Sequence, residues 1–312
     1  MSDAVTEPHV AELRLASASA ADYCRSILAA RSETFWFLTG VAPYRGFSRP
    51  FADRDGRWWW RPKPQFAWAL DYFTPLERPP RMPTGRCAFG YQYPVREEQA
   101  DSRVHFNVIR DLSGYDITRL ASQKRRAVRK GLKELDIGRL DPGDAVVAAE
   151  ACEVWHSHVQ RTGWNKPFDL PVFSGHWRPL ADHAGTNVLG ARDRETGRLC
   201  AWLIGRITAG TAWVDTIASH SDRVAKRPND GLIFAFLYHA ARLPGVRHAN
   251  YFLRSSLETL EAFKQSLGFD SSGLPSRLHV NPLVAAGLRL LKPAAWKRLR
   301  GDWPPPRLTG DK

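Results

Sequence analysis

Three side chains in the second half of the chain are candidates for proton transfer in a reaction: Asp215, His220 and Tyr251. Asp215 stands within the apolar run 213–217, where burial of a strand would raise the pKa of its carboxyl group. Asp is depleted in strand interiors, so we expect it to have a partner there. Asp215 suits a general base, His220 is a second candidate for that role, and the Tyr251 hydroxyl suits a general acid. The alternative is that Asp215 is a structural hydrogen-bond acceptor and Tyr251 a core aromatic residue.

Lys264 could stabilise negative charge on an oxygen. The apolar residues that form one face of a helix expected over 257–267 are Leu257, Leu260, Phe263 and Leu267. Lys264 lies beside that face, and a cation there can stabilise charge that develops on a carbonyl oxygen. The alternative is an exposed pair with Glu261 at i, i+3, which would contribute only a few tenths of a kcal/mol.

A turn over 226–231 leads into an apolar helix expected over 230–242. The first turn of a helix offers free N–H groups and the positive end of the helix dipole to phosphate groups. Asn229 or Asp230 could form the N-cap of this helix. The alternative is a surface turn that only caps a core helix.

Basic residues are concentrated between positions 119 and 139. They are Arg119, Lys124, Arg125, Arg126, Arg129, Lys130, Lys133 and Arg139. Apolar residues between them permit a helix within 112–135, for which Gly131 fits the C-cap. This cluster could contact tRNA, an anionic acceptor or phospholipid head groups, and the alternative is a solvated helix face.

A second mixed segment covers 283–300, where leucines and Trp296 alternate with lysines and arginines. This composition is typical of a helix that lies in a membrane interface, so peripheral membrane contact is one hypothesis for it. Pro293 interrupts the segment, and from Trp303 onward we expect a loose, Pro-rich tail.

The elements that must position these residues alternate between helix and strand. Strands are expected at 137–140, 187–193, 199–207, 211–219, 248–253 and 274–280, and helices at 144–162, 170–182, 230–242 and 257–267. Three antiparallel strands followed by helix, strand, helix and strand predict an α/β fold with a mixed sheet and crossovers. Over residues 10–110 we expect a helix at 20–31, strands at 58–60, 66–70 and 104–110, and a hairpin turn at Asp53–Gly56. The run Trp58–Trp60 requires either that both faces of its strand are covered or that one Trp faces a groove.

Composition limits the class of protein. The chain has 312 residues, a formal charge of +13, 43% hydrophobic and 25% charged residues, which excludes wholesale disorder and suggests an anionic partner. Its four cysteines lack metal or disulfide spacing, so we expect no metal. No apolar run reaches the ~20 residues of a membrane span, and no secretory signal is apparent, so a cytoplasmic location is expected. Serine-hydrolase, zincin and P-loop motifs are absent.

Three stretches together resemble the Gcn5-related N-acetyltransferase (GNAT) superfamily, and within it the FemAB-like branch. They are the basic stretch 122–131, the helix start at 227–233, and 260–269, which is similar to a Phe-Lys-x3-Gly-Phe ending. The resemblance implies a GNAT-like acyltransferase domain over 112–285, preceded by a degenerate GNAT-like lobe over 1–111 in a tandem arrangement. Residues 286–312 would form a basic C-terminal helix and the tail.

The resemblance also implies a reaction. An acyl group would pass from acyl-CoA, such as acetyl-CoA, to an amine of a small molecule or cell-envelope precursor. The residues assigned on this basis are Lys264, Asp215 and Tyr251 for catalysis, Arg227, Asn229 and Gly231 for the donor, and Arg125, Arg129 and Phe263 for the substrate.

One departure from the family pattern leaves the donor open. The family has Arg/Gln-x-x-Gly-x-Gly/Ala, whereas only Gly231 is present here. An aminoacyl-tRNA donor is compatible with such a weakened loop. The competing hypothesis is a non-catalytic scaffold that binds RNA or an anionic polymer. No sequence feature indicates an obligate protein partner.

Overall fold

The computed structural model describes residues 12–30, 49–63, 65–83, 85–163, 167–271 and 273–302. The chain forms two compact units, and each is built from segments that alternate along the sequence. Unit 1 comprises 12–19, 109–251 and 266–269, and unit 2 comprises 20–108, 252–265 and 270–302, within the described residues. The sequence had instead predicted consecutive domains over 1–111, 112–285 and 286–312.

Unit 1 contains a mixed sheet in the order β6-β7-β8-β9-β10. The bounds are β6 Leu135–Arg139, β7 Thr186–Asp193, β8 Leu199–Thr208, β9 Thr211–Ser219 and β10 His248–Leu253. Successive strands are antiparallel up to β9, and β10 then pairs with β9 in parallel after a crossover. This order confirms the predicted mixed α/β sheet and its sequence of elements.

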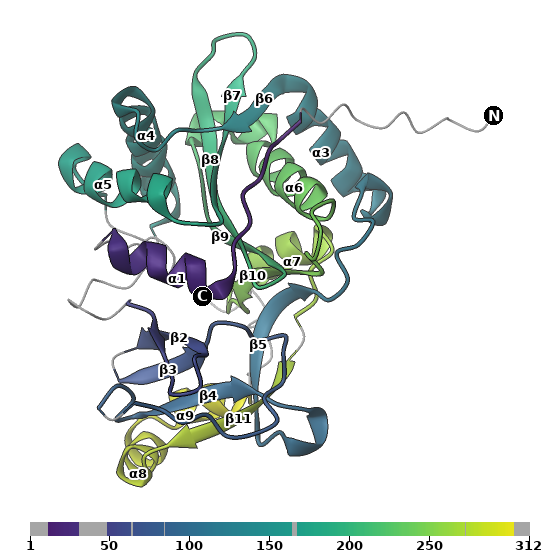
Figure 1. The fold of residues 1–312 in the computed structure, drawn as a ribbon. Coiled ribbons are helices and arrows are strands. Elements are labelled where there is room, and N and C mark those ends of the chain that lie inside the picture. The colour runs from purple at the N-terminus through teal and green to yellow at the C-terminus, as the bar shows by residue number, and fades with distance from the viewer. Residues whose placement is uncertain are drawn as a thin grey trace. The chain divides into compact units, whose positions relative to one another are not determined.

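Helices cover both faces of this sheet, with α3 (Ser122–Glu134) and α6 (Pro228–Ala240) on one side and α4 (Ala145–Thr162) and α5 (Leu170–Trp177) on the other (Figure 1). Local signals fix the ends of α4. The Asp144 side chain accepts from the N–H groups of Val146 and Val147, and Gly163 follows the helix at φ 65°. These ends agree with the predicted helix over 144–162.

Two glycines let α3 and α6 approach closely. A Cβ on Gly131 would lie 2.7 Å from the Arg227 carbonyl oxygen and 3.3 Å from the Gly231 Cα. The prediction that Gly131 caps α3 is therefore wrong: the helix continues to Glu134, and Gly131 is a buried packing position inside it.

Unit 2 contains a second mixed sheet in the order β1-β2-β3-β4-β11-β5. The bounds are β1 Phe51–Ala52, β2 Trp58–Lys63, β3 Phe66–Ala69, β4 Gly90–Pro94, β5 Ser102–Ile109 and β11 Gly273–Val280. β11 pairs with β4 and β5, so a strand from the last quarter of the chain lies between two strands from its first half. Among the described residues of this unit, the α-helices are α1 (Ala20–Ala29), α7 (Glu258–Ser266), α8 (Pro282–Leu291) and α9 (Pro293–Arg300).

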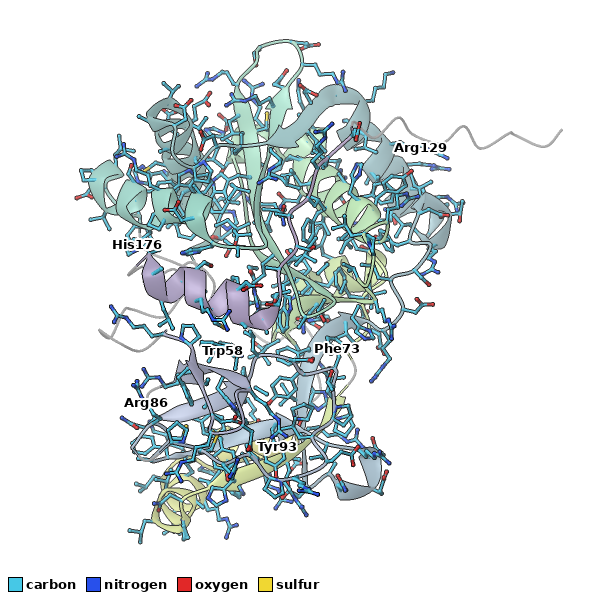
Figure 2. All side chains as sticks on the ribbon, in the orientation of Figure 1. Trp58, Phe73, Arg86, Tyr93, Arg129 and His176 are labelled. Carbon is cyan, nitrogen blue, oxygen red and sulfur yellow. The ribbon has the colours of Figure 1, made fainter. Side chains whose placement is uncertain are left out.

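The tryptophan run lies on β2 and is covered on both faces. Trp59 is fully buried and donates from Nε1 to Asp53 Oδ2 at 3.1 Å. Trp60 is also buried, packs edge-on against Trp68 and contacts Phe252. Trp58, at the start of the strand, is half-buried (Figure 2). The first of the two predicted arrangements is therefore the one found.

Pro293 divides the C-terminal segment into α8 and α9, as its position predicted. The predicted tail from Trp303 lies outside the described residues. Within the parts of the chain that the structure describes, every helix is too short or too polar to cross a bilayer.

Candidate active site

Helix α7 of unit 2 buries two charged residues more deeply than its apolar ones. Lys264 and Glu261 are 3% and 7% exposed, whereas Leu257 is 43% exposed. The predicted apolar face of 257–267 is thus wrong in part, because Leu260 and Phe263 are only half-buried while Leu267 is fully buried. Charged side chains are rarely buried unless they are paired, so their placement calls for partners.

Those partners come from β5 and from the end of β10. Lys264 Nζ donates to the Leu253 carbonyl at 3.1 Å and lies 3.5 Å from Glu261 Oε1. The same Glu261 oxygen accepts from Asn107 Nδ2 at 3.2 Å and from the Ser255 backbone N–H at 2.7 Å. Asn107 is fully buried on β5 and also donates to the Leu253 carbonyl at 3.3 Å. We call Asn107, Glu261 and Lys264 the buried polar cluster.

The backbone beside this cluster is strained. Phe252 has φ 56°, a left-handed conformation that bulky residues rarely adopt. It directly precedes Leu253, whose carbonyl both Asn107 and Lys264 contact. Strain of this kind persists where surrounding contacts enforce it, and it is concentrated at functional sites.

The buried polar cluster contains an ammonium group with a shifted pKa and two acceptor atoms without a described partner. Burial lowers the pKa of the Lys264 ammonium, and the Glu261 carboxylate opposes that shift. Glu261 Oε2 and Asn107 Oδ1 are buried without a hydrogen-bond partner among the described residues. Buried polar atoms are nearly always satisfied, so these two acceptors are suited to a bound polar group.

Asp215 of unit 1 has the partner that its strand position predicted. Its carboxylate accepts from Arg206 Nε, with Oδ2 at 2.9 Å and Oδ1 at 3.2 Å. The Arg206 guanidinium also lies 4.2 Å from the centre of the Trp213 ring, and both charged side chains are almost fully buried. Burial raises the pKa of Asp215 to about 6, although Arg206 opposes the shift. This geometry favours the structural alternative for Asp215 over the general base.

Tyr251 lies on β10, next to the strand that carries Asp215. Its ring packs edge-on against Phe269 at 5.6 Å, and burial raises the pKa of its hydroxyl. Directly before it, Asn250 is fully buried, and neither its Oδ1 nor its Nδ2 has a partner within the described chain. Unit 1 therefore holds an unsatisfied buried carboxamide that the sequence analysis did not single out.

The turn over 226–231, which was expected to bind phosphate, has a different N-cap from the predicted one. α6 begins at Pro228, so Arg227 is the N-cap, with φ 58°, and the predicted N-cap role of Asn229 or Asp230 is wrong. Proline pre-sets the helical φ at the first position and removes one N–H donor. The Gly231 N–H donates to the Arg227 carbonyl at 3.2 Å, and Gly231 itself packs against α3.

The carboxylate in the first turn of α6 already forms an ion pair. Asp230 lies in the first turn and pairs with Lys124 Nζ, with both side chains largely buried. A carboxylate already occupies the positive end of the helix dipole, so it competes there with a phosphate. Of the predicted donor-binding residues, Arg227 is exposed, and Asn229 keeps a buried Oδ1 that has no described partner.

The basic cluster separates into an internal and an external part. Arg125 donates to the Leu120 carbonyl at 3.1 Å and so fastens the turn before α3. Arg129 is exposed on α3 (Figure 2). Together with Arg126 and Lys133 it forms one helix face opposite the buried Val128 and Leu132. We call Arg126, Arg129 and Lys133 the basic stripe; no described residue forms an ion pair with them.

The predicted site residues thus fall into two sets. Asp215 and Tyr251 lie on adjacent strands of unit 1, whereas Lys264 and the half-buried Phe263 lie on α7 in unit 2. His220 is used as a cap, because its Nδ1 accepts from the Asp222 N–H at 3.3 Å. In the described residues, no three His, Cys, Asp or Glu side chains form a group able to hold a metal.

The sequence analysis did not single out Asn107 or Asn250, and it did not predict that Glu261 is buried. A signal was present, because Asn is depleted in strands and both asparagines stand inside apolar strand runs.

The sequence matches no protein-family model and no curated protein. Solved structures, in contrast, match most of the chain. FemX superposes with a TM-score of 0.55 at 11% identity, covering 89% of this chain and all of FemX. L-PGS from Bacillus licheniformis gives 0.52 at 13% identity, covering 93% of this chain and 99% of that one. The C-terminal domain of a protein assigned as a lysylphosphatidylglycerol synthetase, from Agrobacterium fabrum, gives 0.51 at 11% identity, covering 91% and 98%. The chain shares the fold of FemX, of L-PGS and of that C-terminal domain, which agrees with the fold that the sequence resemblance predicted.

Proposed function

We propose that this chain is an acyltransferase that moves an activated acyl group onto an amine of a small molecule or of a cell-envelope precursor. The observation that carries the proposal is the buried polar cluster in unit 2. It places a lysine of lowered pKa beside a glutamate that has one unused buried oxygen. Paired titratable groups with perturbed pKa values are typical of catalytic sites. The fold, which is that of known transferases, agrees with this class of reaction.

The cluster supplies the two functions that acyl transfer needs. The amine nitrogen attacks the acyl carbonyl carbon, a C–N bond forms, and the bond from that carbon to the leaving group breaks. Glu261 Oε2 would take the proton that the amine loses and would pass it to the leaving group as that group departs. The Lys264 ammonium would stabilise the negative charge on the carbonyl oxygen. Asn107 and the Ser255 N–H orient Glu261 through its other oxygen.

The donor that unit 1 favours is an aminoacyl ester of tRNA, with acyl-CoA as the alternative. The start of α6 lacks an N–H at Pro228 and carries the Asp230 carboxylate, both unfavourable for the pyrophosphate of coenzyme A. The basic stripe on the neighbouring α3 suits a long polyanion better than a single cofactor. The name lysylphosphatidylglycerol synthetase, given to one protein of the same fold, also describes the attachment of an amino acid.

A transfer assay tests both the reaction and the donor. The full chain is incubated with tRNA carrying radiolabelled amino acids, or with labelled acetyl-CoA, together with a panel of amines. We expect label to move from tRNA to an amine, and we expect the Lys264→Met variant to abolish this transfer. Transfer from acetyl-CoA alone would overturn the donor assignment but support the acyltransferase.

Binding measurements distinguish the proposed enzyme from a protein that binds RNA without catalysis. A ligand at 100 times its Kd should stabilise the fold by about 2.7 kcal/mol, which a thermal-unfolding assay detects. Binding of charged tRNA without transfer to any amine would contradict the proposed enzyme and favour a protein that only binds RNA.

A further inference from the structure

Helix α8, at the C-terminal end of unit 2, exposes large apolar side chains. Leu283, Leu290 and Leu291 are 84%, 81% and 82% exposed, more than any other large apolar residue in the described chain. Leu283 and Leu290 are seven residues apart, so they lie on the same helix face, and Ala286 lies between them. Isolated exposed leucines are ordinary, but a continuous apolar face on one helix indicates a contact surface.

Cations border this face. Arg289, Lys292, Lys297, Arg298 and Arg300 are all exposed, and no acidic residue occurs from position 281 to 301. The Arg289 guanidinium lies 4.6 Å from the centre of the Trp296 ring, which holds an aromatic residue among the charges. The hairpin of α8 and α9 therefore combines leucines, a tryptophan and positive charge on one short segment.

The inner side of the hairpin is fixed to unit 2. Gln92 Nε2 on β4 donates to the Leu299 carbonyl at 3.3 Å, and His105 Nε2 on β5 lies 2.8 Å from the Gly301 carbonyl oxygen. Ala285 of α8 is buried at 9% exposure, and α9 lies along the β4–β11 side of the sheet (Figure 1). The hairpin is thus a built part of the unit, with an outer side that no described residue covers.

We propose that the α8–α9 hairpin is a peripheral binding site for an anionic lipid bilayer. Such a surface accepts leucine side chains at the level of the head groups and offers negative charge to the surrounding lysines and arginines. RNA would satisfy the cations but leave the leucines in water. A second copy of the chain would bring like charges together, because a two-fold contact places the same patch on both partners. This inference does not depend on the proposed enzymatic function.

Vesicle flotation of the full-length protein tests the apolar part of the site. Vesicles of phosphatidylcholine alone are compared with vesicles that also contain phosphatidylglycerol. We expect binding to the anionic vesicles, and at least about a tenfold weaker partition for the Leu283→Glu/Leu290→Glu variant, since glutamates at these positions prevent insertion. Val146→Glu is the matched control, because Val146 is 69% exposed in the first turn of α4 and lies outside the hairpin.

A second variant tests the charges. Lys297→Gln/Arg298→Gln should weaken binding to the anionic vesicles by about fivefold for each cation removed, and high salt should have a similar effect. Thermal unfolding and sedimentation of each variant establish that it is folded and show its oligomeric state.

Three results would overturn the proposal. The first is the absence of binding to anionic vesicles, and the second is equal binding by the native chain and both hairpin variants. The third is a native dimer that the Leu283→Glu/Leu290→Glu variant dissociates, which would assign the apolar face to a second copy of the chain.

Discussion

Lys264 and Glu261 depend on each other because both are buried on α7, with side chains 4% and 9% exposed. We predict that Lys264→Met lowers the transfer rate by at least about 100-fold, because the positive charge that we propose to stabilise the acyl carbonyl oxygen is lost. Steady-state kinetics measure this effect. Lys292→Met, which removes an exposed lysine between α8 and α9, should leave the transfer rate unchanged.

Loss of Lys264 also leaves a buried carboxylate without its counter-charge, and this alone can cost about 3–5 kcal/mol of stability. The double variant Lys264→Met/Glu261→Gln removes both charges and separates the two effects. It should recover stability in urea unfolding while remaining inactive. Recovery of activity together with stability would show that the pair only supports the fold.

Arg206 and Asp215 form the corresponding buried pair in unit 1, where they stabilise the sheet. We predict that Arg206→Met lowers the free energy of unfolding by about 3–5 kcal/mol at pH 7, because Asp215 then lies buried without its counter-charge. Urea titrations measure the loss. Asp222→Asn, at a side chain that is 82% exposed, is the control that should change stability little.

The pKa of Asp215 gives this prediction a pH dependence. A folded-state pKa of about 6, above the ordinary 3.8, means that the folded chain binds this proton more tightly than the unfolded chain. The corresponding stabilisation is complete below pH 3.8 and is lost as pH rises through 6. Without Arg206 the pKa rises further, so the deficit of Arg206→Met should shrink between pH 7 and pH 5. A deficit that does not vary with pH would contradict this account.

At the scale of elements, the contact between α3 and α6 depends on Gly131. A methyl group there would lie 2.7 Å from the Arg227 carbonyl oxygen, which is part of the backbone and cannot turn away. We predict that Gly131→Ala lowers the free energy of unfolding by about 1–3 kcal/mol despite the better helix propensity of alanine.

Gly175 offers the matched control for that substitution. It lies inside α5, and a methyl group added at this position would have no described atom within 4 Å. Gly175→Ala should therefore stabilise the chain, by up to about 1 kcal/mol. If both alanine variants shift the urea midpoint in the same direction, close packing of α3 on α6 is not what Gly131 provides.

Helix α7 shows where sequence reasoning succeeds and where it fails. The pattern over 257–267 correctly predicted a helix, because helical periodicity is a local property, but it placed Lys264 beside the buried face, whereas Lys264 itself is buried. The same pattern was wrong in part where it assigned the core to leucines. Burial of Glu261 and Lys264 is favourable only because they contact Asn107, Leu253 and Ser255. Those partners lie on other elements, and the order of elements in the sequence does not specify their side-chain contacts.

The same limit applies to the division into units. The order of strands in unit 1 follows from local patterns and short connections, and it was predicted correctly. Unit 2 joins β4 to β11 across most of the chain, and nothing in either strand's own sequence indicates the other. Long-range pairing of this kind cannot be deduced from propensity, which explains why consecutive domains were expected instead.

Exposed cations gather on two surfaces of different composition in a chain whose net charge is +13. The basic stripe on α3 has cations without exposed leucines, whereas the α8–α9 hairpin has both. Cations alone suit a polyanion such as RNA, and cations with leucines suit a lipid surface. The two surfaces should therefore be separable by mutation.

We predict a reciprocal loss of binding. Arg126→Gln/Arg129→Gln/Lys133→Gln should weaken tRNA binding and reduce the slope of log affinity against log salt by about two to three, since each phosphate contact contributes about 0.7–0.9. Its binding to anionic vesicles should be unchanged. Lys297→Gln/Arg298→Gln should weaken vesicle binding and leave the tRNA salt slope as it is. If each variant instead weakens both ligands in proportion to the charge removed, only the net charge of the molecule governs its anionic partners.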